Sequence, residues 1–322
     1  MEFRRLGKTD LMLSQIGFGA ASLGDVYNAI DPAEGIRAVH MAIDEGINFF
    51  DVAPYYGKTL AEERLGQALA GRRDEVILAT KCGRYDVDEF DFSADAVRAG
   101  LEASLTRLGT EYVDLLQVHD VEFCEYAQII NETLPELRRL QSEGKIRYVG
   151  ITGYPLGMLT RILTASPIDS VLSYCRYNLM ITDMDDLLTP AAQQYGVGLI
   201  NASALNMGIL TARGASDWHP APDGLKAVGQ HAVRYAEERG VRLSNQALRF
   251  CFDHPYVSST LVGMSTTEHV RANMEALRNQ SDREFQEEVR RLFGEFFNYV
   301  WPSGKPENCD TSRTAETCLE KH

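Results

Sequence analysis

The chain has 322 residues, of which 44% are hydrophobic and 24% charged, values that are ordinary for a globular protein with a large core. Its net charge of −14 argues against nucleic acid and anionic membranes as partners, because both bind basic surfaces. No apolar run approaches the roughly 20 residues of a membrane span, and the N-terminal residues lack the apolar segment of a signal peptide. The six cysteines contain no C-x-x-C pair, so we expect no metal site and a reduced, cytoplasmic location.

Residues 3–16 alternate between polar and apolar around a Gly-Lys-Thr-Asp turn, which predicts a β-hairpin. The stretch that follows, residues 16–24, nearly matches the G-x-G-x-x-G fingerprint of a Rossmann dinucleotide-binding fold. However, Ser22 stands at the third glycine, and no helix signal follows directly. The alternative is a glycine-rich strand end around Gly19, to which a ligand or a backbone comes close.

From residue 31 onward, helix signals alternate with short apolar runs that read as strands. Asp31 followed by Pro32 is a typical helix start, and Gly46 ends that helix. Counting the strand at residue 16, eight strand–helix units are predicted, which favours a (β/α)8 TIM barrel over an open doubly wound sheet. The further strands are predicted at 47–50, 75–81, 113–119, 146–151, 170–175, 196–203 and 259–263.

An extra C-terminal helix is predicted after the barrel, where residues 281–284 read as a helix cap before an apolar stripe. We therefore predict one barrel domain over residues 1–300, preceded by the N-terminal hairpin. Residues 301–322 are polar without periodic apolar positions, which predicts a disordered tail.

Four titratable side chains follow three successive predicted strands: Asp51, Tyr56, Lys81 and His119. In a barrel, the carboxyl ends of neighbouring strands share one face, so these side chains would meet. A free phenol has a pKa of about 10, and a nearby ammonium favours the phenolate. The acid then fixes the lysine, and the histidine orients a substrate oxygen. This set predicts a proton relay that accompanies hydride transfer at an alcohol carbon. From position alone, Tyr55 is an equal candidate for the reactive phenol.

The run Asp-x-Ala-x-x-Tyr-Gly followed by Glu-x-x-Leu-Gly, over residues 51–66, resembles the signature of the aldo-keto reductases. Lys81 and His119 match that family's remaining catalytic positions. The resemblance covers about residues 3–300. It implies a (β/α)8 barrel, a nicotinamide cofactor bound at the carboxyl face, and Tyr56, directly before the glycine, as the acid/base.

The resemblance also implies a set of cofactor-binding residues, and some of them depart from the common pattern. Ala202 replaces the tyrosine that usually stacks on the nicotinamide. His269 stands where many members carry an arginine for the 2′-phosphate, and no Lys or Arg occurs from residue 263 to residue 270. We therefore expect NAD, with NADP as the alternative. The cofactor-binding residues expected are Gly19, Thr152, Gly153, Tyr174, Ser203, Leu205, Gly263, Ser265, His269 and Asn273.

Within the family, residues 150–153, 172–175, 201–208 and 301–304 resemble the branch that oxidises free aldoses, such as L-galactose or L-fucose, to lactones. A small sugar is then the expected substrate, with Asp120, Asn206 and Trp301 as its contacts. Two alternatives stay open: an NADP-dependent reductase of aldehydes or ketones, and a cofactor-binding regulatory subunit. The oligomeric state is not indicated.

Overall fold

The computed structural model describes residues 1–26 and 28–310. Within this part of the chain, eight parallel strands close into a barrel in the order β10-β3-β4-β5-β6-β7-β8-β9. This closed order confirms the predicted barrel. The alternative prediction, an open doubly wound sheet, is wrong. The strands are β3 (Ile16–Gly19), β4 (Phe49–Asp51), β5 (Ile77–Cys82), β6 (Val113–Val118), β7 (Ile146–Gly153), β8 (Ser170–Tyr174), β9 (Gly198–Ala202) and β10 (Val257–Gly263).

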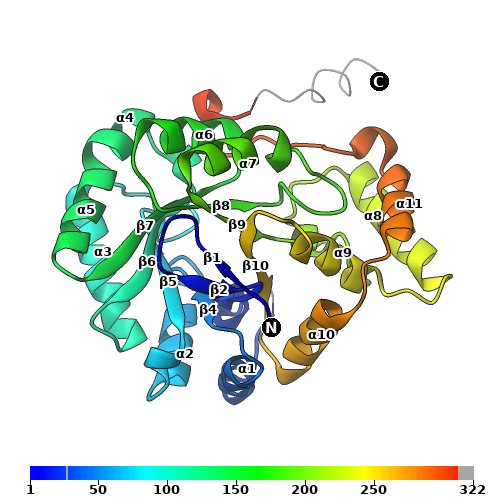
Figure 1. Cartoon of the computed structure of the whole chain (residues 1–322), viewed down its shortest axis with the longest axis horizontal. Helices are drawn as coiled ribbons and strands as arrows, with labels where there is room; N and C mark the ends of the chain where they lie inside the picture. Colours follow the sequence, from blue (N-terminus) through cyan, green and yellow to red (C-terminus); the bar gives the residue numbers. More distant parts are fainter. Residues whose placement is uncertain (27, 311–322) are drawn as a thin grey trace.

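Helices surround the barrel and connect its strands (Figure 1). Their ends follow local chemistry: the Asp31 side chain accepts a hydrogen bond from the N–H of Ala33, and Gly109 ends α3 in a left-handed conformation. No helix among the described residues is long and apolar enough to cross a membrane. The helices are α1 (Pro32–Asp44), α2 (Leu60–Leu69), α3 (Ala94–Leu108), α4 (Tyr126–Gln128), α5 (Leu134–Ser142), α6 (Leu156–Ala165), α7 (Met184–Tyr195), α8 (Asp223–Glu237), α9 (Leu243–Phe252), α10 (Thr267–Arg278) and α11 (Arg283–Leu292).

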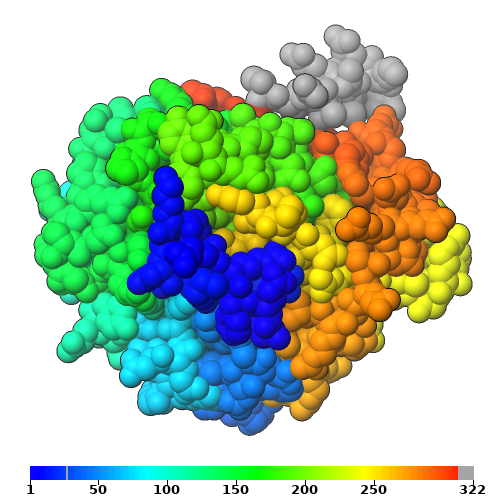
Figure 2. Space-filling model, in the orientation of Figure 1, coloured from blue at the N-terminus to red at the C-terminus, as the bar shows by residue number. Residues whose placement is uncertain are grey.

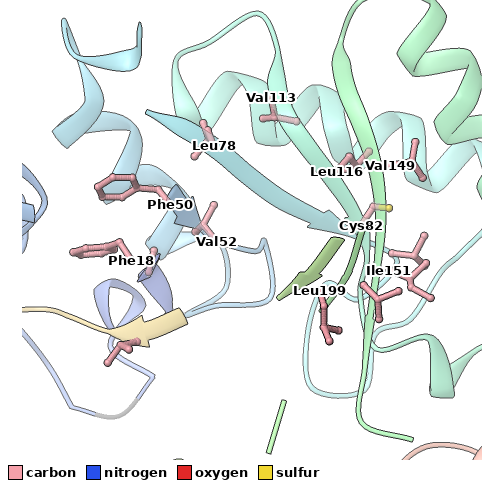
Figure 3. Packing of buried hydrophobic residues seen from close by; sticks show 14 of the residues in the cluster. Phe18, Phe50, Val52, Leu78, Cys82, Val113, Leu116, Val149, Ile151 and Leu199 are labelled. Carbon is pink, nitrogen blue, oxygen red and sulfur yellow. The ribbon is translucent and has the colours of Figure 1, made fainter. Parts of the chain in front are cut away.

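The core has two layers, because successive strand residues point to opposite sides of the barrel wall. Phe50 and Leu116 belong to the cluster that packs between the strands and the helices, where Phe18 stacks on Phe50 at 5.0 Å between ring centroids (Figure 3). Their neighbours Phe49 and Leu115 belong to a second cluster that fills the barrel interior. The strands are therefore held rigidly from both sides.

The amino-terminal end of the barrel is closed by the predicted hairpin, β1 (Phe3–Arg5) and β2 (Met12–Ser14), which covers the centre of the face seen in Figure 2. Arg4 donates hydrogen bonds to the carbonyl oxygens of His254 and Val257, at 2.7 and 3.0 Å. Leu6 and Leu13 pack into the interior cluster. Because this end is plugged, the opposite end, at the carboxyl termini of the strands, is left to form a site.

The prediction of a disordered tail from residue 301 is wrong as far as residue 310. Trp301 is buried, and the Asp310 carboxylate accepts a 2.7 Å hydrogen bond from Arg176. Asp310 also accepts hydrogen bonds from two backbone N–H groups of the first turn of α6, both at 2.9 Å. Each of these contacts involves an isolated residue and not a repeating apolar pattern, so the sequence did not predict them. The rest of the predicted tail, residues 311–322, lies outside the described residues.

Candidate active site

A cavity of about 960 Å³ opens at the carboxyl ends of the strands. This volume lies at the upper end of the range for small-molecule sites, about 300–1,000 Å³. Asp51, Tyr56, Lys81 and His119 all line it. The sequence prediction placed these four residues in one site, and the structure brings them together.

Lys81 and Asp51 form a buried ion pair at the base of the cavity, with side chains only 1% and 4% exposed. The ammonium also donates a 2.9 Å hydrogen bond to the carbonyl oxygen of Val52. The second carboxylate oxygen of Asp51 accepts a 2.7 Å hydrogen bond from Nε2 of Gln117. The lysine therefore has a fixed position, because both of its partners are themselves held.

The two neighbouring tyrosines face different cations. The Lys81 ammonium lies 4.9 Å from the centroid of the Tyr56 ring, whereas the Arg84 guanidinium lies 4.0 Å from that of Tyr55. Gly57, which follows, has a φ of 63°, and a Cβ there would lie 2.0 Å from the carbonyl oxygen of Gly24. Only glycine fits this turn, so the turn fixes the direction of both rings.

His119 is held as a neutral imidazole. Its side chain is nearly buried, and burial lowers its pKa to about 3, assisted by the charges of Lys81 and Arg84 against the opposing effect of Asp120. Its ring stands edge-on to that of Tyr56, with 5.7 Å between centroids. Within the described residues Nδ1 has no hydrogen-bond partner. A neutral imidazole in this place can exchange hydrogen bonds with a substrate oxygen without bringing a charge.

Nine of the ten predicted cofactor residues line the cavity; Gly153 does not. It lies behind the wall, where a Cβ would come within 2.7 Å of Oε2 of Glu122.

On the β10 side, Gly263 faces open space. The atom nearest to a Cβ built there is Ser22 Oγ, a buried hydroxyl that lacks a partner among the described residues. Arg213 lines the same region and donates a 3.2 Å hydrogen bond to Asn28. This open, polar and cationic stretch fits the phosphate linker of a dinucleotide.

Two of the three predicted substrate residues, Asp120 and Trp301, line the cavity. Trp301 is stacked on Tyr154 with 4.7 Å between ring centroids, so it is a packed wall rather than a loose cover. Asn206, the third, does not line the cavity. Its backbone is left-handed with a φ of 48°, its side chain is buried, and its place in the cavity wall is taken by Met207.

Glu122 joins three segments behind this wall. One of its carboxyl oxygens accepts hydrogen bonds from the Tyr154 N–H at 3.2 Å, Tyr174 Oη at 3.4 Å and Ser303 Oγ at 3.1 Å. Complete burial, and after it the nearby charge of Asp120, raises the pKa of Glu122 to about 8. The C-terminal segment is thus attached to the barrel through a carboxyl group.

Arg242, at the N-terminus of α9, was not predicted from the sequence. It lines the same cavity as His269 and Asn273, and its guanidinium is 3.9 Å from the Glu275 carboxylate. The prediction of NAD rested on residues 263–270, which contain no Lys or Arg. That range does not include Arg242, which also reaches this part of the cavity.

Comparison with known proteins agrees with this geometry. The model of the Aldo/keto reductase family matches residues 15–292. The chain belongs to the aldo/keto reductase family. An L-galactose dehydrogenase of Arabidopsis thaliana is 42% identical over 318 residues, covering 96% of this chain and 99% of the plant protein. A D-arabinose 1-dehydrogenase of Saccharomyces cerevisiae is 31% identical, covering 91% and 95%.

Among solved structures, the holo form of an aldo-keto reductase from Bacillus halodurans superimposes with a TM-score of 0.77 at 28% identity, covering 94% of this chain and 98% of that one. As an aldo/keto reductase, this protein is an oxidoreductase, and its family implies a nicotinamide cofactor. The cavity described above is where such a cofactor fits.

Proposed function

We propose that this protein oxidises a free aldose at its anomeric carbon, giving a lactone, with NAD as the acceptor. The observation that carries the proposal is the position of the Lys81 ammonium, which is fixed by Asp51 and lies 4.9 Å from the ring of Tyr56. The names of the Arabidopsis and yeast relatives support an aldose as the substrate.

In this proposal Tyr56 is the acid/base. A free phenol with a pKa of about 10 is ionised in only about one molecule in a thousand at pH 7, so an adjacent cation is needed. Lys81 supplies that positive charge, and Asp51 keeps the ammonium in place. The phenolate accepts the proton of the anomeric hydroxyl while the C1 hydrogen leaves with its electron pair. A bound nicotinamide supplies the acceptor for that hydride.

His119 holds the oxygen that reacts. Because burial keeps its imidazole neutral, it can donate an N–H hydrogen bond to the anomeric oxygen while the phenolate removes the proton. A protonated imidazole would place a second cation beside Lys81. Trp301 and the other residues of the C-terminal segment exclude water from one side of the cavity.

The cofactor would be held by the nine predicted residues that line the cavity, with Ser22 and Arg213 beside its phosphate linker. We propose NAD rather than NADP because His269 replaces the arginine expected for a 2′-phosphate. The position of Arg242 in the same cavity favours a second candidate function, NADP-dependent reduction of aldehydes or ketones. A purely regulatory, cofactor-binding role would not require a buried Lys81–Asp51 pair beside a phenol.

The proposal is tested by screening free aldoses with NAD and following NADH absorbance, for the wild type and for the matched variants Tyr56→Phe and Tyr55→Phe. We expect L-galactose or a related aldose to be oxidised. Tyr56→Phe should lower kcat by about 10²–10⁴-fold while NAD binding is kept. Tyr55→Phe should keep most of kcat. Oxidation of no aldose, or full activity in Tyr56→Phe, would contradict the proposal.

A further inference from the structure

Arg84 and Asp120 form a second charged pair in the cavity wall, beside the proton relay. Nη1 of Arg84 donates a 2.5 Å hydrogen bond to Oδ2 of Asp120, and both residues line the cavity. The guanidinium is enclosed by three aromatic rings, with centroids 4.0 Å away for Tyr55, 5.2 Å for Phe90 and 5.4 Å for Phe123. Arg84 is therefore fixed, and it holds the carboxylate in turn.

The backbone at Asp120 is also specialised. Its φ is 52°, a left-handed conformation that is costly for a residue with a side chain and that tends to persist where function requires it. Its N–H donates a 3.0 Å hydrogen bond to Oγ1 of Thr152 on the next strand. The carboxylate is thus placed at the cavity surface by a strained backbone and two hydrogen bonds, while its side chain is only 6% exposed.

Asp120 also lies close to the histidine that would hold the reacting oxygen. Oδ2 of Asp120 lies 3.7 Å from Nε2 of His119. If His119 holds the reacting oxygen, the hydroxyl on the neighbouring carbon of the sugar is close enough to that oxygen to reach Asp120 at the same time.

We propose that Asp120, positioned by Arg84, accepts a hydrogen bond from the hydroxyl on the carbon next to the one that reacts, which is the 2-hydroxyl of an aldose. This inference rests on the proposed function, and it defines the substrate class as α-hydroxy aldehydes in their lactol form. Asp120 is then the residue that determines specificity, and Arg84 is a positioning residue. Sites built to bind a hydroxyl reject the analogue that lacks it, because the buried polar group is left without a partner.

The experiment compares three substrates: the best aldose from the screen, its 2-deoxy analogue and its 6-deoxy analogue. For the wild type, we expect the 2-deoxy sugar to lose roughly 100-fold or more in kcat/KM, while the 6-deoxy sugar loses much less. In Asp120→Asn, kcat/KM for the 2-deoxy sugar and for the parent aldose should differ by less than about 10-fold, because the parent aldose loses the hydrogen bond from its 2-hydroxyl to the carboxylate. Arg84→Lys should also reduce the preference for the parent aldose over the 2-deoxy sugar. A lysine ammonium does not reproduce the planar guanidinium that holds the Asp120 carboxylate.

The control is Asp114→Asn. Asp114 is a buried aspartate near the start of β6, the strand that leads to Asp120, and it pairs with Arg73 and Arg147 at 2.8 Å. This variant should lower stability and leave the ratio between the two sugars unchanged. If Asp120→Asn does not fold, Arg84→Lys carries the test.

Equal use of the 2-deoxy and parent sugars by the wild type, or an unchanged ratio in Asp120→Asn, would overturn the inference while leaving aldose oxidation standing. If no aldose is oxidised, the proposed function fails, and the same comparison is made in reduction with glyceraldehyde against propanal. A preference for glyceraldehyde that disappears in Asp120→Asn would still support the recognition by Asp120. Equal use of both aldehydes, or no use of either, would overturn it.

Discussion

Gln117 and Asp51 are joined inside the barrel by a 2.7 Å hydrogen bond from the amide Nε2 to a carboxylate oxygen. The other oxygen of that carboxylate binds the Lys81 ammonium. Both oxygens of Asp51 are therefore engaged, and the carboxylate cannot rotate away from the lysine. The amide of Gln117 on β6 thus fixes Asp51 on β4, and Asp51 in turn fixes Lys81 on β5.

Replacing Gln117 should therefore impair the reaction rather than the fold. Gln117→Met keeps the volume and removes a hydrogen bond to a charged group, a loss of about 1.5–3 kcal/mol if all of it is felt at the site. We expect kcat to fall roughly 10-fold, with NAD binding little changed. Gln15→Met is the matched control, because Gln15 is a buried glutamine that donates a 2.7 Å bond to Phe252 at the plugged end. Equal effects of both variants on kcat would contradict a positioning role.

The buried pair itself predicts a separation of stability from activity. Lys81→Met leaves the Asp51 carboxylate without its cation, and removing one partner of a buried pair costs about 3–5 kcal/mol of unfolding free energy. Adding Asp51→Asn removes the uncompensated charge and should restore most of that stability, but no activity. Urea unfolding and turnover of the single and double variants measure both effects. A double variant no more stable than Lys81→Met would show that the pair is not an energetic unit.

Glu122 predicts a dependence of stability on pH. Its folded pKa is raised to about 8 from an ordinary value of 4.5, so the folded protein holds a proton that the unfolded chain releases. The stabilisation from this proton is complete below pH 4.5 and is lost as the pH rises through about 8, with a slope of at most about 1.4 kcal/mol per pH unit. Glu122→Gln should remove that slope.

The measurement for Glu122 is the unfolding free energy of the wild type and of Glu122→Gln between pH 5 and 9. The difference between them should change steadily in favour of the glutamine variant up to about pH 8 and then level off. Glu125→Gln serves as the control, since Glu125 is solvent-exposed. Parallel pH profiles for the wild type and Glu122→Gln would disprove the assignment.

Cofactor choice gives the last prediction. We expect the wild type to use NAD more efficiently than NADP. Among the residues that line this part of the cavity, the only cation near His269 is Arg242, and its side chain is exposed. Arg242→Ala should lower kcat/KM for NADP by about 10-fold and leave that for NAD within about 2-fold, since a phosphate dianion needs a cationic partner. A strong NADP preference in the wild type would show the NAD assignment to be wrong.

Much of the fold could be predicted from the sequence, because the strands are short apolar runs separated by well-signalled helices. The four relay residues could be found because each follows such a run, and barrel closure brings strand ends together. Gln117 offered a signal that was overlooked: it is a polar residue inside an otherwise apolar buried strand. Such a residue needs a partner in the interior.

Other parts of the site could not be predicted because they depend on backbone direction or on distant pairing. Gly153 follows Thr152 directly, yet strand alternation turns it away from the cavity. Asn206 is turned inward by a left-handed backbone that its sequence does not announce. Arg84 and Glu122 are recognisable only through their partners, Asp120 and Ser303, which lie 36 and 181 positions away.

The contact between Ser303 and Glu122 joins a separate C-terminal wall to the barrel. All eight strands lie before residue 264, so the barrel takes no strand from the C-terminal segment. The segment that carries Trp301 and Ser303 packs onto this barrel from outside the sheet. A chain truncated after residue 295 would contain all four relay residues and all eight strands, but its substrate chamber would stand open on one side.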